Sequence, residues 1–271
     1  MFVPSFTSSA GSHGRMPDQT LESIFSLAGQ VAIITGGSRG IGRGIAETFG
    51  AAGARLALVA RDPARLAETG DQLRGKGYEV LDCPADVAVE AGVNAIAQRV
   101  VEQFGQVDIL INNAGIIQAG PIGNFTAADW ERMIATNLTS VFYFCRAVAP
   151  LLSARRSGRI INIASITGQT GGVSGGVHYS ASKGGMLALT KTLARDLAPY
   201  NVTVNAICPG QIESDSAIFT PEARKRLEAM IPLGRIGRPA DIAHAALFLA
   251  SAAASYITGA AIDVNGGLLK R

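Results

Sequence analysis

Short apolar runs recur along the chain and alternate with amphipathic stretches, a pattern that predicts strands connected by helices. Runs at Val31–Thr35, Arg55–Ala60 and residues 159–163 are the clearest strands, and further ones are expected at 78–83, 107–111, 202–207 and 260–264. Strands that read as continuous apolar runs are typical of a parallel sheet covered on both faces. The pattern therefore predicts one doubly wound α/β domain, a Rossmann fold of about seven strands with helices on both faces.

Cap signals and helical spacing place several of the helices. Asp62 followed by Pro63 is typical of a helix N-cap and predicts a helix to about residue 74. Thr126 and Asp129 resemble a capping box that opens a long helix to about residue 154, and residues 90–104 carry apolar positions at helical spacing. We expect residues 1–25 to form an N-terminal arm, flexible to about Gln19, and residues 26–271 to form the domain; Met16 is an alternative start.

Composition narrows the class of protein. Hydrophobic residues make up 48% of the 271 residues and charged ones 17%, which suits a sheet buried on both faces. The net charge is +3, and residues 224–226 form a short basic cluster with acidic neighbours, so neither nucleic acid nor a membrane is expected as a partner. Three dispersed cysteines and three dispersed histidines predict no disulfide framework and no metal site, and a reducing cytoplasm is the expected compartment.

A glycine-rich turn follows the first strand. The segment Gly36-Gly-Ser-Arg-Gly40-Ile-Gly42 leads from that strand into a helix. Glycines allow close approach of the backbone to a phosphate, and the unpaired N–H groups at a helix start attract anions. The spacing differs from the common dinucleotide fingerprint, so this motif alone is equally compatible with an ordinary turn.

Tyr179 and Lys183 lie four residues apart in a segment expected to be helical, so their side chains share one face. A cation beside a phenol favours the phenolate, which makes the pair a candidate acid and base. The same spacing also occurs on solvated helix edges. The pair gains weight from the glycine turn and from Asn112-Asn113-Ala114-Gly115, which ends the fourth predicted strand.

In their order, these three motifs resemble the short-chain dehydrogenase/reductase family over roughly Ser26 to Leu269, nearly the whole domain. The resemblance implies that Tyr179 donates a proton to a carbonyl oxygen while a nicotinamide delivers hydride. It also implies that Lys183 lowers the tyrosine pKa and binds the nicotinamide ribose. Ser165 would orient and polarise the carbonyl, with Thr167 as the nearest competing hydroxyl, and Asn137 would hold a water that relays protons to the lysine.

The end of the second strand bears on the choice of cofactor. An Asp or Glu there would bind a ribose 2′-hydroxyl and select NAD(H), but this chain has Ala60 followed by Arg61. A guanidinium suits a 2′-phosphate, and Arg39 in the glycine turn is placed to bind it from the other side. We therefore predict NADP(H) rather than NAD(H), and interpret the competing Asp62 as the helix cap.

The resemblance implies the other cofactor contacts. They are the turn around the phosphates, residues near the adenine, residues near the adenosine ribose, and the segment under the nicotinamide: Gly36, Ser38, Gly40, Ile41 and Gly42; Asp86 and Val87; Asn113, Ala114 and Gly115; Pro209, Gly210 and Ile212. Residues 211–232 would form a substrate lid with an apolar wall of Ile212, Ile218, Phe219 and Met230. Other candidates to reach the substrate are His178, Gln169 and Gln211.

Among family members, the chain is most similar to β-ketoacyl reductases, which implies a small-molecule carbonyl substrate, such as a 3-oxoacyl thioester. A sugar, polyol or other secondary-alcohol dehydrogenase is the alternative within the family, and a dinucleotide sensor without turnover is the alternative outside enzymes. Family habit implies a homotetramer or homodimer, paired through the Tyr179 helix and the last strand.

Overall fold

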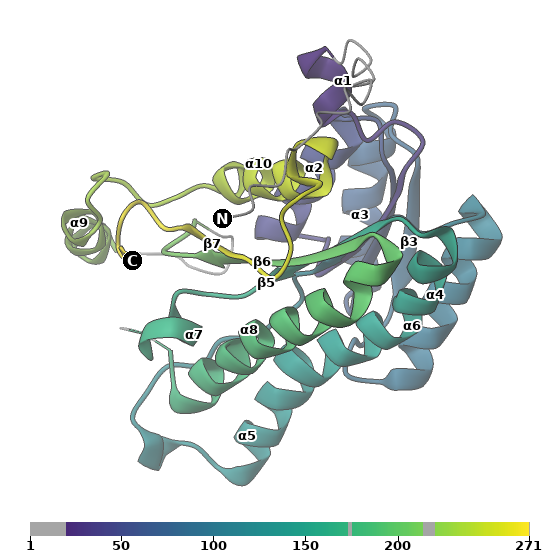
Figure 1. The fold of residues 1–271 in the computed structure, drawn as a ribbon. Helices are drawn as coiled ribbons and strands as arrows, with labels where there is room; N and C mark the ends of the chain where they lie inside the picture. The colour runs from purple at the N-terminus through teal and green to yellow at the C-terminus, as the bar shows by residue number, and fades with distance from the viewer. Residues whose placement is uncertain (1–19, 173–174, 214–219, 271) are drawn as a thin grey trace, which may run out of the picture.

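Seven parallel strands form one sheet in the order β3-β2-β1-β4-β5-β6-β7 (Figure 1). The structure is a computed structural model that describes residues 20–172, 175–213 and 220–270. The strands are β1 (Val31–Thr35), β2 (Arg55–Ala60), β3 (Val80–Pro84), β4 (Ile109–Asn112), β5 (Gly158–Ile163), β6 (Val202–Pro209) and β7 (Ala261–Val264). The doubly wound α/β fold predicted from the sequence is confirmed.

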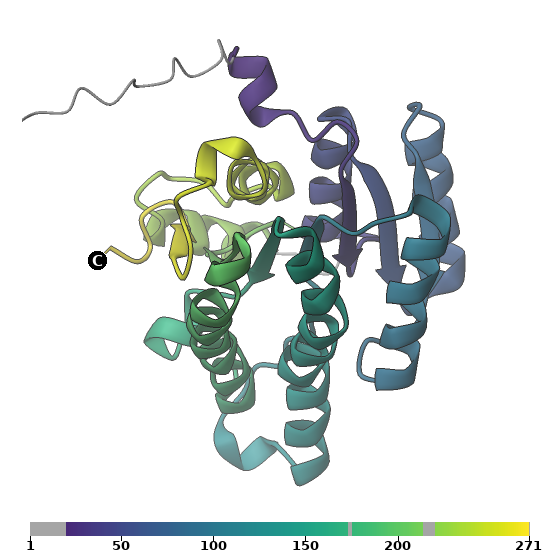
Figure 2. The same cartoon turned by 45° about the vertical axis from the view of Figure 1, so that its right-hand side comes forward.

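Helices cover both faces of this sheet (Figure 2). Helices α4 (Glu90–Phe104), α6 (Ser140–Arg155) and α8 (Val177–Leu197) pack on one face, and α2 (Gly40–Ala51), α3 (Pro63–Arg74) and α10 (Pro239–Ala250) pack on the other. The remaining helices and turns are α1 (Leu21–Phe25), α5 (Ala127–Ile134), α7 (Thr167–Thr170), α9 (Pro221–Met230), η1 (Ile122–Asn124), η2 (Ala135–Thr139), η3 (Ala198–Tyr200) and η4 (Ala252–Ala254).

The strands separate two apolar cores. Along β1, Val31 and Ile33 point into the core under α4, α6 and α8, while Ala32 and Ile34 point into the core under α2, α3 and α10. All four side chains are fully buried. Because alternate strand residues face opposite sides of a sheet, a strand with consecutive apolar residues fills both cores.

Several predicted strand boundaries move by one or two residues. Pairing of β3 with β2 begins at Val80 opposite Leu56, two residues later than predicted. Strand β4 begins at Ile109, just after Asp108, whose carboxylate accepts a hydrogen bond of 2.8 Å from the Val31 amide. Strand β6 continues to Pro209, which pairs with Val264 of β7. Such shifts come from pairing partners that apolar patterning does not identify.

The long helix predicted from Thr126 to about residue 154 is interrupted. The capping box of Thr126 and Asp129 is present, but a single π-helical turn, η2, separates α5 from α6. Here Asn137 is fully buried, and the Ser140 hydroxyl donates to the Thr136 carbonyl at 2.6 Å. A π-turn often marks a functional site, because the extra residue redirects side chains and frees backbone groups.

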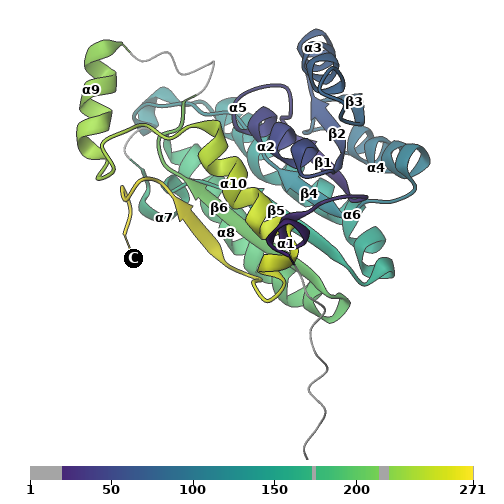
Figure 3. The ribbon, with the colours of Figure 1, turned by 90° about the horizontal axis from the view of Figure 1, so that it is seen from above.

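The last residues of the expected N-terminal arm form a short helix. Thr20 caps this helix, α1, which comprises residues 21–25. Figure 3 shows α1 beside the end of α10, which η4 follows. Residues 1–19 lie outside the described part.

Candidate active site

The ends of β1 and β4 are joined by the hydroxyl of Thr35. Its oxygen accepts hydrogen bonds from the amides of Asn113 and Ala114, both at 2.9 Å, and it donates to the Ile111 carbonyl at 3.2 Å. The Asn113 side chain donates to the carbonyls of Thr35 and Gly36. Between these two strands the chain order reverses, which is where doubly wound sheets bind ligands. Thr35 was not among the predicted site residues.

The glycine turn has the geometry that its sequence predicts. Gly36 and Gly40 adopt positive φ of 66° and 51°. A methyl group on Gly42 would collide with the carbonyl oxygen of Gly36, so only glycine fits at the start of α2. Helix α2 therefore begins directly at the turn and presents its unpaired N–H groups there.

A cleft of about 520 Å³ opens beside this turn. Its walls include eleven of the predicted cofactor residues: Gly36, Ser38, Arg39, Gly40, Ile41, Arg61, Asp86, Val87, Asn113, Ala114 and Gly115. Residues that were not assigned to the site also line it, namely Ala60, Asp62, Arg65, Ala85, Ile116 and Thr136. Arg65 lies one turn into α3, a position that no motif identifies, although its spacing from Arg61 could have indicated it.

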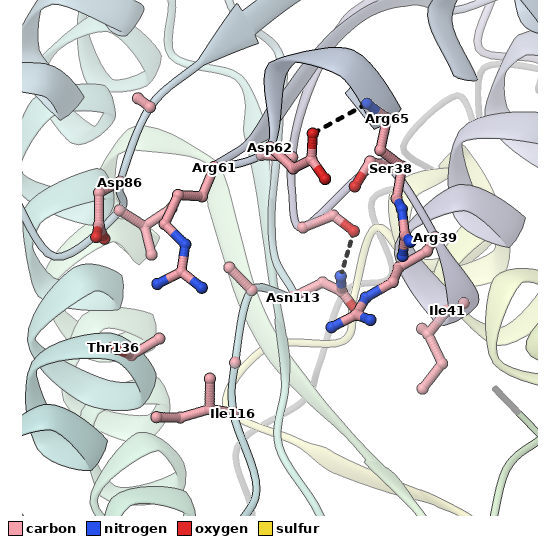
Figure 4. Close-up of a pocket in the computed structure, with 17 residues that line it drawn as sticks. Ser38, Arg39, Ile41, Arg61, Asp62, Arg65, Asp86, Asn113, Ile116 and Thr136 are labelled. Atoms are coloured by element: carbon pink, nitrogen blue, oxygen red, sulfur yellow. Dashed lines mark hydrogen bonds between the residues drawn. The ribbon is translucent and has the colours of Figure 1, made fainter. Parts of the chain in front are cut away.

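Cationic side chains dominate this cleft. Figure 4 shows Arg39 and Arg65 on one side of the cleft and Arg61 on the other. Asp62 is the N-cap of α3, because its carboxylate accepts from the amides of Ala64 and Arg65 at 3.1 Å. That carboxylate therefore acts as the helix cap it was interpreted to be. A helix N-terminus with three guanidinium groups suits a phosphorylated nucleotide, so the residues fit a nicotinamide dinucleotide.

Tyr179 lies in the first turn of α8, beside Ser165, which follows β5. The Ser165 hydroxyl accepts a hydrogen bond from the amide of Thr167 at 3.1 Å, and it lies close enough to the phenol to lower the pKa of Tyr179. Burial raises the pKa of Tyr179 above its ordinary value of 10, and the Ser165 hydroxyl opposes that effect. In the chain alone desolvation is the larger influence, so the net shift is upward, and the lowering of this pKa by Lys183 stays a prediction.

Lys183 lies one turn below the phenol. Its ammonium nitrogen is 5.9 Å from the centre of the Tyr179 ring and donates to the Ile163 carbonyl at 2.7 Å. Burial lowers the pKa of Lys183 to about 8. The structure thus brings Ser165, Tyr179 and Lys183 together at the carboxyl end of β5, as the sequence motifs predicted.

Asn137, the fourth catalytic candidate, forms its hydrogen bonds chiefly with the backbone of Ile116, in the segment after β4. Its side chain accepts from the Ile116 amide at 2.8 Å and donates to the Ile116 carbonyl at 2.9 Å. It also lies 3.3 Å from the Ser182 hydroxyl. The Asn137 side-chain amide therefore links the segment after β4 to α8. Its role in holding a water remains a prediction.

The predicted residues under the nicotinamide lie apart from the arginine cleft. Pro209 ends β6, Gly210 donates to the Val264 carbonyl at 3.1 Å, and Ile212 forms a bridge with Gly237. Ile212 lines a second cavity of about 550 Å³. Nearby, Arg224 forms an ion pair with Glu213 at 2.8 Å, and α9 has no buried residue, so its basic cluster is a solvated face.

The residues predicted for the lid and for substrate contact differ in their placement. Ile218 and Phe219 lie outside the described residues, whereas Met230 is half exposed. Gln169 donates to the Asp263 carboxylate at 2.8 Å, and Gln211 lines the second cavity. His178 is fully buried, which excludes it from direct contact with a substrate.

Neither a metal cluster nor a membrane span is found among the described residues. No group of three or more His, Cys, Asp or Glu side chains there is placed to hold a metal ion. Within those same residues, every helix is too short or too polar to cross a membrane.

Comparisons with known proteins agree with this site. A family model described as enoyl-(acyl carrier protein) reductase matches residues 36–269. The 3-oxoacyl-[acyl-carrier-protein] reductase FabG of Chlamydia pneumoniae is 40% identical over 90% of this chain and 98% of its own length. That of Aquifex aeolicus is 38% identical over 89% and 98%. The crystal structure of a putative gluconate dehydrogenase from Agrobacterium tumefaciens superposes with a TM-score of 0.87 at 38% identity, covering 92% of this chain and 99% of that chain.

Proposed function

Because the chain belongs to the short-chain dehydrogenase/reductase family, we propose that it uses NADPH to reduce the carbonyl of a 3-oxoacyl thioester to a secondary alcohol. The observation that carries this proposal is that Ser165, Tyr179 and Lys183 lie together at the carboxyl end of β5, with the Lys183 ammonium nitrogen 5.9 Å from the centre of the phenol ring. These groups lie at the same sheet edge as the nucleotide cleft. That arrangement supports proton donation to a carbonyl beside a nicotinamide.

The protein's own groups would then act as follows. The bound nicotinamide supplies the hydride. Ser165 donates a hydrogen bond to the carbonyl oxygen and holds it near the phenol, and Tyr179 transfers its proton to that oxygen as the alcohol forms. The Lys183 ammonium stabilises the phenolate that remains, because a cation near a phenolate lowers its energy.

The preference for NADPH rests on the arginines of the cleft. Ala60 supplies no carboxylate for a ribose 2′-hydroxyl, whereas Arg39, Arg61 and Arg65 line the same cleft. A hydrogen bond to a charged group contributes about 1.5–3 kcal/mol. Arg61→Ala should therefore raise the KM for NADPH roughly 10- to 100-fold and leave the KM for NADH nearly unchanged.

Arg43 offers a matched control for this test, since it pairs with Glu47 and does not line the cleft. Arg43→Ala should leave both constants unchanged. A native enzyme with a lower KM for NADH than for NADPH would refute the assignment of Ala60 and Arg61.

The substrate is tested by following NADPH absorbance with acetoacetyl thioesters and a panel of ketones. The relatives named as 3-oxoacyl-[acyl-carrier-protein] reductases support the thioester. Oxidation of a sugar acid is the second candidate, because the superposed structure is that of a putative gluconate dehydrogenase. Turnover of gluconate alone would favour that second reaction, and tight NADPH binding without any turnover would favour a sensor.

For assembly, the proposal is a homotetramer or homodimer in the cytoplasm. Strand β7 is at one edge of the sheet, pairs only with β6 among the described strands, and is partly exposed, so its free edge can pair with a second copy. All three cysteines are buried and none forms a disulfide, as suits a reducing compartment. Light scattering tests the assembly, and a monomer would refute it.

A further inference from the structure

His178 immediately precedes the proposed proton donor, Tyr179, and its ring lies in a buried cage formed by Gln118, Phe125 and Gly176. Its side chain is fully buried, and its Nε2 atom lies 3.2 Å from Oε1 of Gln118. The ring packs against Phe125, with ring centres 4.1 Å apart and planes inclined by 39°. Since Gln118 and Phe125 belong to the segment between β4 and α5, this histidine joins that segment to the first turn of α8.

The direction of the hydrogen bond follows from the Gln118 atom that faces the ring. That atom is the side-chain amide oxygen Oε1, 3.2 Å from Nε2 of His178. An amide oxygen only accepts hydrogen bonds. His178 must then be the donor, with its proton on Nε2.

The other ring nitrogen has no partner. Nδ1 of His178 is buried without a hydrogen bond among the described residues. A buried acceptor without a partner destabilises the fold. A phenylalanine would fill the same cage without that cost, so packing alone does not account for the imidazole.

The cage is in direct contact with the backbone that starts the catalytic helix. The amide of Gly176, the N-cap of α8, donates to the Gln118 carbonyl at 2.9 Å. A methyl group on Gly176 would come within 2.7 Å of the His178 ring and would also meet Phe125. The segment after β4 and the first turn of α8 therefore form one packed unit that includes the Tyr179 backbone.

We propose that His178, as the neutral tautomer protonated on Nε2, is a positioning residue that ties the β4–α5 segment to the start of α8 and so orients Tyr179. His178 acts through its hydrogen bond to the Gln118 oxygen and does not contact the substrate. It rests on the proposed function only for its kinetic readout, since the tautomer is measured independently.

Three variants test the kinetic part. His178→Phe keeps the ring and removes the donor, His178→Gln keeps a donor near the Nε2 position, and the double variant Q118L/H178F replaces both partners by apolar groups. One hydrogen bond contributes up to about 1.5 kcal/mol, which corresponds to roughly tenfold in rate. We expect His178→Phe to lose about tenfold in kcat while its Kd for NADPH and its Tm stay near native.

His178→Gln should recover most of the kcat, whereas the double variant should fold stably and stay as slow as His178→Phe. Native kcat in His178→Phe would overturn the proposal. It would also be overturned if His178→Gln lost as much as His178→Phe while both lost Tm in parallel, since that pattern belongs to a purely structural residue.

Nitrogen-15 NMR of histidine-labelled native enzyme tests the tautomer without any substrate. The His178 signals, identified by their loss in His178→Phe, should show a protonated Nε2 and a bare Nδ1 at neutral pH, next to the exposed His244 as a reference. A proton on Nδ1 would refute the proposal. If the native enzyme turned over no carbonyl, the proposed function would fail while this spectrum could still confirm the tautomer.

Discussion

Thr35→Val should weaken the junction that carries the cofactor site. The substitution keeps the side-chain shape and removes only the hydroxyl, which accepts two amide hydrogen bonds of 2.9 Å and donates one of 3.2 Å. Thr35 is 2% exposed, so a water molecule cannot take the place of its hydroxyl and form those hydrogen bonds. The amides of Asn113 and Ala114 and the carbonyl of Ile111 would each lose a partner.

The expected loss follows from how far those groups are buried. Leaving a buried polar group unpaired costs about 1–3 kcal/mol, and the two amides are only partly buried, so each takes about 1 kcal/mol. With the carbonyl, Thr35→Val should lose about 2–3 kcal/mol of unfolding free energy. NADPH should bind more weakly as well, because Asn113 and Ala114 line the cleft.

Thr35→Ser is the matched control. It keeps the hydroxyl and gives up one buried methyl group, which costs about 1 kcal/mol. Urea unfolding at one fixed protein concentration measures both variants, and calorimetry measures their NADPH affinity. If Thr35→Val were as stable as Thr35→Ser and bound NADPH equally well, the hydroxyl would not hold the two strand ends together.

Three further predictions concern the site itself. Tyr179→Phe should lower kcat by about 10²–10⁴-fold with the Kd for NADPH nearly unchanged, while Tyr200→Phe, at an exposed position, should have no effect in the same steady-state assay. Gly42→Ala should abolish NADPH binding in calorimetry, because the new methyl group collides with the phosphate turn; Gly123→Ala, where nothing lies within 4 Å, should bind normally. The pKa of Lys183 is lowered to about 8 in the folded protein and is near 10.5 in the unfolded chain. Between these two values the unfolded chain binds the proton more readily, so the folded state gains stability as the pH rises through this window. The unfolding free energy of wild type relative to Lys183→Met should therefore rise between pH 8 and 10.5, and a flat difference in urea titrations would contradict the shift.

The strands and the cleft were predictable because their physical requirements are local. A buried parallel strand must be apolar at most positions, and the Gly36–Gly42 turn requires glycine where φ is positive or a side chain would collide. The caps at Asp62 and Thr126 also depend on neighbours within three residues, and both are present. Signals that depend only on neighbouring residues can be recognised in a single sequence.

Features that depend on distant partners were missed. Thr35 became part of the site through strand ends 76 to 79 residues away, and the hydrogen-bond partner of His178 is a glutamine 60 residues away. Arg65 reaches the cleft only because α3 directs it there. The π-turn at Asn137 likewise reflects the contacts of its side chain with Ile116, which helical periodicity does not encode.

The protonation states of the proposed catalytic pair, Tyr179 and Lys183, favour proton donation to a carbonyl near neutral pH. Burial raises the pKa of Tyr179, so the phenol carries its proton at pH 7, the state that donates to a carbonyl. Oxidation of an alcohol requires that proton to leave first, against the desolvation of the phenolate. Lys183 remains an ammonium below its lowered pKa of about 8, where its charge supports the phenolate formed by proton transfer. Above that pH the lysine loses its charge while the phenol is still protonated. The proton donor is then still present, but the phenolate that it leaves behind is no longer stabilised by the ammonium. The reductive rate should therefore fall at a lower pH than that at which the tyrosine itself titrates.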